Sequence, residues 1–508
     1  MSASDSPDIS TATGARRVFL VVPHGFAARY LLRTAILETL LEAGLHVVVL
    51  APNANEEYLR RELSGRGVEL EQLRAGDEVD GSRVWKALVY LRRNTLGGGE
   101  STTTLRARYR NARRRLETAQ PLVARALDLA VRALWRSRAL RKLLLRFECR
   151  AFAPDVHRDL FERHRPALVV TTSPGWFLAD AVVLREARRH GARTAAVVMA
   201  WDNPTSKGYR GACVDRVVAW SESMADELVR HHDLPPEIVS VAGVPSFDRY
   251  VAPEGLLSRE EALHSLGLDP ARRLVVFAGR SPSSYAHNVT VAEALARGAA
   301  EGAWGEPAQL LVRPHPIHFR ADHRTPMDAY GELTGRYPHV SIDVPEVLSE
   351  RLACDLSPAD NLRFASVLRH CDVLVNLFST TTLEAFLLDR PVVLVSPAAH
   401  RALGLNEDAE DSRSFDEDAH VQATVREGAA RVAGTLDELI ELVGGYLAEP
   451  ELDSEARASV ATAECGPTDG AAGRRTAGLL LELLDEGDAA PVGTQRVHPD
   501  DRSVEARA

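Results

Sequence analysis

The sequence predicts an α/β protein with two facing halves, each built on a doubly wound parallel sheet. Short continuous apolar runs, such as residues 18–22 and 373–375, are typical of strands that are buried on both faces. Segments with helical spacing follow these runs, and the order strand, helix, strand favours parallel pairing. The pattern occurs before and again after about residue 250. Two such halves predict a ligand cleft between the carboxyl edges of their sheets.

The first half is expected to span residues 18–250, with strands at 18–22, 46–52, 167–172, 194–200, 215–221 and 238–245. Amphipathic periodicity predicts its helices at 28–43, 56–63, 177–190 and 222–232. The second half is expected to span 251–487, with strands at 274–281, 309–316, 339–343, 372–376 and 391–396. Its helices are predicted at 288–300, 360–370, from 381 onward, 435–448 and 471–486. Polar tails at 1–17 and 488–508 are expected to be disordered.

Composition narrows the class of protein. The chain has 508 residues, 45% hydrophobic and 26% charged, which is ordinary for a globular protein of two or three domains. A net charge of −10 argues against a nucleic-acid binder. The five cysteines are scattered without a C-x-x-C pair, which argues against a disulfide framework and fits a reducing compartment. Because no apolar run approaches about 20 residues, we expect a cytoplasmic protein.

Residues 101–150 form a basic insertion in the first half. They contain fourteen Lys or Arg and three Asp or Glu, and their spacing is mostly helical with a break at Pro121. One reading is a solvated basic face on a helical insertion. The other is a surface for anionic membrane lipid or a polyanionic acceptor, on the inner face of the cell membrane.

Two predicted turns at the sheet edge of the first half carry polar groups. His24, in the turn P-H-G, is placed to act as a general base, although a capped histidine in a tight turn is the plain alternative. In the loop W-D-N-P-T-S-K-G, Asp202 and Asn203 suit acceptor hydroxyls and Lys207 suits a phosphate or carboxylate. Trp201 either stacks on a sugar ring or packs, and an Asx turn before a proline explains the loop nearly as well.

Two turns of the second half suit a phosphate. Gly279 permits close backbone approach, Arg280 can hold a diphosphate through two hydrogen bonds, and Ser281 adds a hydroxyl. In R-P-H-P, two prolines rigidify the strand exit and present Arg313 and His315. Because the sequence shows no carboxylate pair nearby, we predict no metal site.

The stretch D-V-L-V-N-L-F-S-T-T-T-L-E-A-F (372–386) predicts a third phosphate turn. A buried strand runs into hydroxyl residues, among them Ser379, Thr380 and Thr381, and then into a helix. Unpaired N–H groups and the helix dipole favour an anion there. A capping box from Thr381 to Glu384 is the structural alternative.

The H-P pair (315–316) and the S-T-T-T-L-E-A turn (379–385) resemble bacterial GT-B glycosyltransferases with CMP- or CDP-linked donors. These include sialyltransferases, capsule Kdo transferases and the CDP-glycerol glycerophosphotransferases of teichoic acid synthesis. The resemblance implies two Rossmann-like domains and a last helix that returns to the first. It also implies that His315, Ser379, Thr380 and Thr381 contact the donor phosphate and that Glu384 holds the ribose.

The sequence therefore predicts a metal-independent, inverting transferase without a cofactor. It would move a sugar or polyol phosphate from a nucleotide-linked donor to a cell-surface polysaccharide or its lipid-linked precursor. His24 or Asp202 would deprotonate the acceptor, while Arg280, Arg313 and the 379–382 helix start would neutralise the leaving phosphate. One alternative is a non-hydrolysing sugar-nucleotide epimerase. Another is a non-catalytic scaffold of polysaccharide assembly that docks through 101–150.

Overall fold

The computed structural model describes ten stretches of the chain, residues 16–74, 83–97, 102–152, 154–252, 255–282, 285–305, 307–319, 327–349, 351–396 and 419–488. Residues 1–15 and 489–508, which make up most of the two predicted tails, lie outside these stretches. In the described residues no helix is both long and apolar enough to cross a bilayer.

The first half contains a seven-stranded parallel sheet in the order β3-β2-β1-β4-β5-β6-β7. Its strands are β1 (Arg17–Val21), β2 (His46–Ala51), β3 (Val68–Gln72), β4 (Leu168–Thr171), β5 (Arg193–Val197), β6 (Arg216–Ala219) and β7 (Val239–Val241). In the register, Val18 lies opposite both Val47 and Leu168. Parallel pairing brings the carboxyl ends of all these strands to one edge.

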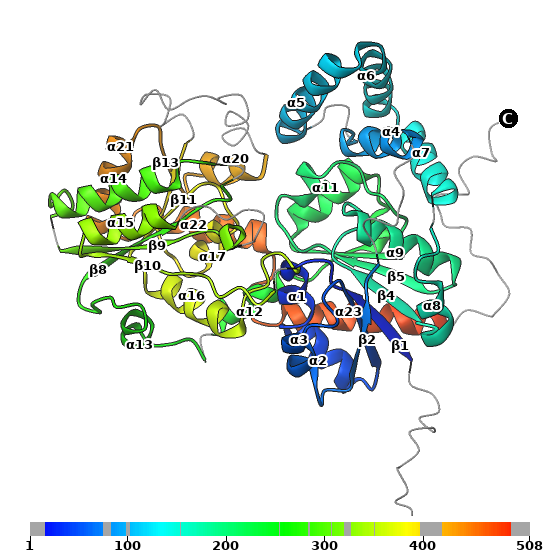
Figure 1. The fold of residues 1–508 in the computed structure, drawn as a ribbon, viewed down its shortest axis with the longest axis horizontal. Helices are drawn as coiled ribbons and strands as arrows, with labels where there is room; N and C mark the ends of the chain where they lie inside the picture. The colour runs from blue at the N-terminus through cyan, green and yellow to red at the C-terminus, as the bar shows by residue number, and fades with distance from the viewer. Residues whose placement is uncertain are drawn as a thin grey trace, which may run out of the picture.

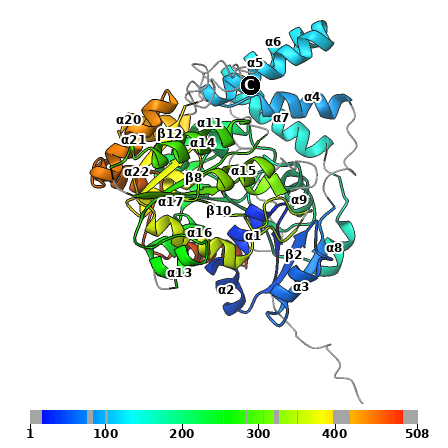
Figure 2. The ribbon, with the colours of Figure 1, turned by 60° about the vertical axis from the view of Figure 1, so that its left-hand side comes forward.

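The second half contains a six-stranded parallel sheet in the order β10-β9-β8-β11-β12-β13. Its strands are β8 (Arg273–Ala278), β9 (Ala308–Arg313), β10 (Val340–Ile342), β11 (Val373–Asn376), β12 (Val392–Val395) and β13 (Arg431–Ala433). The two sheets lie side by side with helices against them (Figures 1 and 2). The predicted fold class, two parallel-sheet halves, is confirmed.

Helices cover both sheets. Those of the first half are α1 (Gly25–Leu31), α2 (Ala35–Glu42), α3 (Glu57–Leu63), α4 (Arg83–Arg93), α5 (Thr103–Ala119), α6 (Pro121–Arg136), α7 (Arg138–Ala151), α8 (Arg158–His164), α9 (Leu178–Arg189), α10 (Asn203–Ser206) and α11 (Glu222–His232). The 3-10 turn η2 (Pro245–Phe247) and α12 (Asp248–Val251) form the crossing. Then follow α13 (Arg259–His264), α14 (Asn288–Ala300), α15 (Asp328–Arg336), α16 (Pro358–His370), α17 (Thr381–Leu387), α20 (Ala419–Arg426), α21 (Leu436–Ala448), α22 (Ser454–Cys465) and α23 (Ala472–Asp488).

One predicted helix, 28–43, is divided in the structure. The break falls between α1 and α2, where the Thr34 hydroxyl donates to the Tyr30 carbonyl oxygen (2.7 Å) and accepts from the Ile36 N–H (3.4 Å). Threonine competes with the backbone for hydrogen bonds in this way, and it starts a second helix here.

The basic insertion, residues 101–150, forms helices α5 to α7, and together with α4 these make a helical arm, which we define as α4 to α7. The arm stands above α11 in Figure 1. Arg141 holds it to the first half through two hydrogen bonds with the Asp233 carboxylate (2.7 and 2.9 Å). The fully buried Glu148 of α7 pairs with Arg92 of α4 within the arm (3.3 Å) and with Arg185 of α9 in the body of the first half (2.8 Å). The pairs Arg141–Asp233 and Glu148–Arg185 therefore fix the arm to the body of the protein.

The last helix, α23, follows the second half in sequence but packs on the first. Leu480, Leu483 and Leu484 are buried in the core that contains α2 and the strands of the first sheet. The Asp248 carboxylate accepts hydrogen bonds from the first N–H groups of α23, those of Ala472 (2.9 Å) and Gly473 (2.8 Å). The two halves are therefore interlocked by the end of the chain.

Candidate functional site

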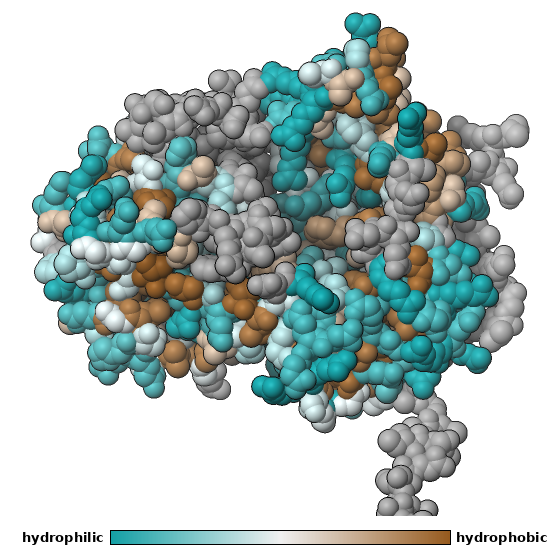
Figure 3. Space-filling model, viewed as in Figure 1, coloured by the Kyte–Doolittle hydropathy of each residue, from teal (hydrophilic) through white to brown (hydrophobic). Residues whose placement is uncertain are grey.

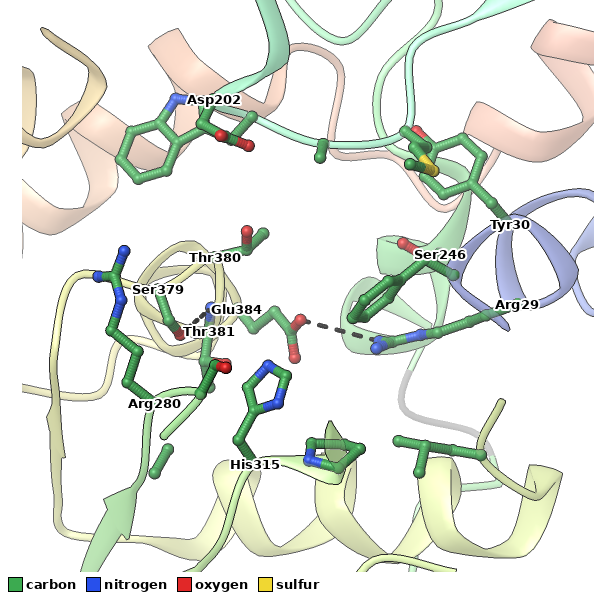
Figure 4. A pocket seen from close by; sticks show the side chains of 18 of the residues that line it. Arg29, Tyr30, Asp202, Ser246, Arg280, His315, Ser379, Thr380, Thr381 and Glu384 are labelled. Atoms are coloured by element: carbon green, nitrogen blue, oxygen red, sulfur yellow. Dashed lines mark hydrogen bonds and ion pairs between the residues drawn. The ribbon is translucent and has the colours of Figure 1, made fainter. Parts of the chain in front are cut away.

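A cavity of about 570 Å³ lies between the carboxyl edges of the two sheets (Figure 4). The fourteen residues predicted for the site all line it, namely His24, Trp201, Asp202, Asn203, Lys207, Gly279, Arg280, Ser281, Arg313, His315, Ser379, Thr380, Thr381 and Glu384. The fold thus brings together turns that are as much as 360 residues apart, since residues 24 and 384 face the same space. Their individual roles follow from their contacts.

His24 is the N-cap of α1. Its Nδ1 accepts a hydrogen bond from the Ala27 N–H (3.2 Å), so the proton of the neutral ring lies on Nε2. Nε2 is buried without a hydrogen-bond partner among the described residues. Burial, and to a smaller extent the charge of Lys207, lowers the pKa of His24 to about 4. In this arrangement His24 offers the cavity a neutral N–H donor and not the lone pair of a base.

Asp202 and Asn203 begin the short helix α10 on the same wall. The Asp202 carboxylate accepts from the Ser206 hydroxyl (2.6 Å) and lies 3.6 Å from the Lys207 ammonium. Asn203 is 1% exposed, and its Nδ2 has no partner among the described residues. An unsatisfied buried donor beside a cavity is an expected feature of a ligand site. This wall therefore offers an anionic acceptor and an unused amide donor.

The surroundings of α10 are rigid. The Trp201 indole is buried and donates to a Glu464 carboxylate oxygen of α22 (2.7 Å), so packing, the plainer reading, describes its ring. The buried His232 donates through Nε2 to the Pro204 carbonyl oxygen (2.8 Å). The loop is thus held from both sides, and the predicted Asx turn is replaced by the contact between Asp202 and Ser206.

Gly279 and Arg280 line the opposite wall at the end of β8. A Cβ on Gly279 would lie 3.1 Å from Asn288 Oδ1, which shows how closely the backbone is approached there. The Arg280 guanidinium donates to the carbonyl oxygens of Leu377 (2.7 Å) and Phe378 (3.3 Å). Arg280 therefore joins the turn after β8 to the turn after β11, and Figure 4 shows its side chain along the cavity wall.

The structure corrects the interpretation of Arg313. Its terminal nitrogens bind the carboxylates of Asp343 and Asp360, and its guanidinium lies 4.4 Å from the centre of the Phe364 ring. A guanidinium that is 6% exposed and already paired has little capacity to hold a diphosphate. Arg313 stiffens the end of β9 beside the cavity.

His315 points into the cavity toward Glu384 (Figure 4). Its Nδ1 accepts from the Ile317 N–H (3.1 Å), so Nε2 carries the proton of the neutral ring. This contact spans the second proline of R-P-H-P and sets the ring orientation. Like His24 across the cavity, His315 presents a donor.

The turn after β11 differs from its predicted form. Thr380 is the N-cap of α17 without a side-chain cap, and the Ser379 hydroxyl instead accepts from the Thr381 N–H (3.1 Å). The structural alternative, a capping box from Thr381 to Glu384, is therefore wrong. Phe378 has a φ of 53°, a left-handed conformation that is rare for a bulky residue and marks a sharp strand-to-helix turn. Because α17 has only seven residues, the hydroxyl groups of this turn contribute more to binding an anion than the helix dipole does.

Glu384 joins the two halves. The Tyr250 hydroxyl donates to its carboxylate, and the Arg29 guanidinium lies 3.7 Å away. Burial opposes the charge on Arg29, but Glu384 is the main cause that raises its pKa above the ordinary value. Burial, followed by the charge of Glu384, raises the pKa of Tyr250. These contacts link the two halves across the cavity, and the ribose contact that the resemblance implies for Glu384 stays a prediction.

Sequence reasoning missed several lining residues, among them Arg29, Arg108, Ser246, Tyr250 and Asn361. Ser246 and Tyr250 belong to the P-S-F-D-R-Y crossing, whose position between the halves was a usable signal. Arg29 lies in α1 and has no local motif. Arg108 is on α5 of the helical arm, and its guanidinium donates to the Ser206 carbonyl oxygen (2.7 Å).

One cluster has metal-ligand spacing in the part of the chain that the structure describes. It consists of Glu69, Glu71 and His164, and none of the three lines the cavity.

No protein-family model matches the chain. A lipid-A-disaccharide synthase from Geobacter sulfurreducens is 27% identical over 329 residues, which cover 60% of this chain and 72% of that protein. Another from Geobacter metallireducens is 25% identical over 348 residues, 62% and 77% of the two chains.

Solved structures match over nearly the whole chain. A glycosyltransferase from Rickettsia africae has 11% identity and a TM-score of 0.50, with 94% of this chain and 100% of that chain covered. The UDP-GlcNAc 2-epimerase from Neisseria meningitidis, bound to UDP-GlcNAc, has 12% identity and a TM-score of 0.50, with 92% and 100% covered.

Two facing parallel sheets with a cavity between their carboxyl edges define the GT-B architecture that these glycosyltransferases and epimerases share. This chain has that fold and is a distant relative in sequence of lipid-A-disaccharide synthases.

Proposed function

We propose that this protein transfers a sugar or polyol phosphate from a nucleotide-linked donor to a hydroxyl of a cell-surface polysaccharide or its lipid-linked precursor. One observation carries the proposal. On the second-half wall of the cavity, Arg280, His315 and the hydroxyls of residues 379–381 lie together, and on the first-half wall the Asp202 carboxylate lies beside the unused amide of Asn203. Such a division suits a phosphorylated leaving group on one side and a nucleophilic hydroxyl on the other.

The donor is assigned to the second half. Thr380 and Thr381 make no hydrogen bond through their hydroxyls to the described residues, and these groups are available to phosphate oxygens. Arg280 and the Nε2–H of His315 supply further donors from neighbouring turns. Together they would stabilise the negative charge that develops on the leaving phosphate.

The acceptor is assigned to the first half. Asp202 is the base of choice because its carboxylate is partly solvated, at 31% exposure, and accepts protons, whereas His24 presents a proton. Lys207 and Ser206 orient the carboxylate, and Asn203 Nδ2 is placed to bind an acceptor oxygen. His24 would donate to the same substrate. The transfer is proposed to invert configuration and to need neither metal nor cofactor.

The similarity to lipid-A-disaccharide synthases supports synthesis of a glycosidic bond on a lipid-linked acceptor. Within the larger class, the CMP- or CDP-dependent transferases remain our proposal for the donor, because the H-P pair and the Ser/Thr turn line one wall.

The epimerase alternative is less well supported by the cavity. A sugar-nucleotide epimerase needs several cleft carboxylates for proton transfer. Among the described lining residues two are acidic, Asp202 and Glu384, and the second is bound to Tyr250 and Arg29. Turnover of a nucleotide sugar without any acceptor would reverse this preference. Nucleotide binding without donor consumption would instead indicate the scaffold.

A thermal-shift panel with CMP, CDP, UDP and dTDP tests the proposal. A ligand at a hundred times its Kd stabilises the folded state by about 2.7 kcal/mol, which is a measurable rise in Tm. We expect one nucleotide to raise Tm and Arg280→Ala to abolish the shift. Arg297→Ala, an exposed position on α14, is the matched control and should keep the shift. The absence of a shift with all four nucleotides would contradict the proposal.

The role of His315 needs a separate measurement. His315→Ala is expected to lower donor turnover by about 10²-fold, the usual effect of a lost donor to a developing anion. Wild-type turnover in this variant would remove His315 from the mechanism.

A further inference from the structure

The helical arm carries most of the exposed apolar surface in the described part of the chain. Ten large hydrophobic residues are exposed among all the described residues. Seven of them belong to the arm, namely Val84, Leu122, Val123, Leu129, Leu140, Leu143 and Phe147. Leu122 is 77% exposed and Leu129 70%. Scattered exposed apolar residues are ordinary, but their concentration on one substructure marks an interaction surface.

These residues occupy single faces of two helices. On α6, Leu122 and Leu129 are seven residues apart and thus two turns apart on one face. On α7, Leu140, Leu143 and Phe147 have the spacing i, i+3, i+7. The opposite faces bury Val131 and Leu145 among others, so both helices already have a core-facing side and carry a second apolar stripe outward.

Basic side chains accompany the outward stripes. Arg125 and Arg136 on α6 and Arg150 on α7 are exposed and form no ion pair with the described residues. The contrast with the rest of the chain is sharp, because residues 101–150 hold three of the 71 acidic residues but fourteen of the 61 basic ones. Brown side chains lie over α6 and α7 beside teal ones in Figure 3.

We propose that the outward faces of α6 and α7 dock on an anionic lipid bilayer. Leucine and phenylalanine would enter the boundary between headgroups and acyl chains while the arginines bind lipid phosphates, which is the composition of an interfacial helix. Charge complementarity selects this occupant. A protein partner with an acidic, apolar groove is one alternative occupant. A second copy of this chain is another. Its net charge is −10, but the two basic arms would have to be buried against each other.

The arm is tied to the cavity. The Thr102 hydroxyl donates to the Thr205 carbonyl oxygen (2.6 Å), and Arg108, which lines the cavity, donates to Ser206 (2.7 Å). Both contacts end on α10, next to Asp202 and Asn203. The arm that would bind the bilayer therefore contacts the wall that we assign to the acceptor. The docking itself does not depend on the proposed transferase activity.

Flotation of the full chain with lipid vesicles tests the docking. The probes are vesicles of phosphatidylcholine alone and vesicles that also contain phosphatidylglycerol. We expect recovery with the anionic vesicles, a decrease with added salt, and little recovery with the neutral ones. Equal recovery with both, or none with either, overturns the proposal.

Two pairs of variants locate the surface. Leu129→Glu with Leu143→Glu should lower vesicle partitioning at least tenfold, whereas Val344→Glu, an exposed valine (49%) outside the arm, should not. Arg125→Gln with Arg136→Gln should lower it about thirtyfold, because each basic residue near an anionic leaflet contributes about 1 kcal/mol. The matched control is Arg297→Gln with Arg426→Gln on the second half.

We expect each variant to fold because all the substituted side chains are exposed. Circular dichroism and Tm check this expectation. Wild-type flotation of both arm variants overturns the proposal. Sedimentation should not show a dimer that becomes a monomer in Leu129→Glu with Leu143→Glu. That result would also overturn the proposal, because the face would then be a contact between two copies of the chain.

Discussion

Substitution of Gly25 by alanine tests whether the cavity depends on the fit between the two halves. A Cβ on Gly25 would lie 2.1 Å from the Asp355 backbone nitrogen, 2.3 Å from its Cα and 2.4 Å from the Cys354 carbonyl carbon. Ordinary contact begins at 3.4 Å, so the two backbones must separate by about 1.3 Å, the difference of 3.4 and 2.1. All three atoms belong to backbone and not to a flexible side-chain end.

The loop that meets Gly25 has little freedom to move. The fully buried Asp355 accepts from Arg33 (2.5 Å) and from the Tyr58 hydroxyl (2.5 Å), both in the first half. The Gly25 N–H also donates to the Ala353 carbonyl oxygen (2.8 Å). The added methyl group must therefore shift the turn that holds His24 relative to the second half.

We expect Gly25→Ala to lower kcat by about 10²-fold, because a displacement of about 1 Å between reacting groups has an effect of that size. Overpacking should also lower the free energy of unfolding by about 1 to 3 kcal/mol. Nucleotide affinity should stay within about threefold of wild type, since the donor wall lies on the second half. Steady-state kinetics, urea unfolding and nucleotide titration measure the three quantities.

Gly331→Ala is the matched control. Gly331 lies in α15 with nothing within 4 Å of the added Cβ, so alanine should stabilise the helix by up to about 1 kcal/mol and leave kcat unchanged. Wild-type kcat in folded Gly25→Ala would refute the reasoning that catalysis requires this fit.

Three further outcomes follow from single contacts. Asp202→Asn should lower kcat by about 10² to 10⁴-fold and retain the nucleotide-induced Tm shift, whereas His24→Asn, which keeps a helix cap, should lower it about tenfold or less; the reverse order would assign the base to His24. Burial raises the pKa of Asp180 to about 7, so the folded state loses stability as pH rises from about 3.8 to about 7. Asp180→Asn should therefore be more stable than wild type by about 2 to 4 kcal/mol in urea unfolding at pH 8, and equal stability at that pH would count against a protonated Asp180. Burial lowers the pKa of His232 to about 3, so wild type should lose stability as pH falls from about 6.5 toward 3 while His232→Gln shows a flatter acid limb in thermal unfolding; parallel limbs would argue against a neutral buried His232.

The sheets were predictable from the sequence because strands buried on both faces are short continuous apolar runs. The expected strand at 372–376 is β11 (Val373–Asn376), and its four residues are buried. β3 escaped prediction because V-E-L-E-Q alternates apolar and charged residues at the edge of the sheet and is half exposed. The break at Thr34 was missed because the apolar period continues through it.

The location of the site was predictable and its contacts were not. Parallel strands bring their carboxyl ends to one edge, so polar turns after strands converge without knowledge of side chains. Partners such as Asp343 and Asp360 for Arg313, or Arg29 and Tyr250 for Glu384, come from distant elements with no local pattern. The capping box does not form because the N-cap is Thr380 and not Thr381. Glu384 therefore lies one residue beyond the position that a capping glutamate must occupy.

The path of α23 has a consequence for how the protein is made. Domains of most chains fold in order as they leave the ribosome. Here Leu480, Leu483 and Leu484 complete the core of the first half, yet they are synthesised after the whole second half. Until residue 488 leaves the ribosome, α23 cannot pack on α2 and its neighbouring strands. The first half therefore completes its folding last. A nascent chain that stops before residue 472 would expose that apolar face to chaperones and proteases, although every residue of the first sheet had been made.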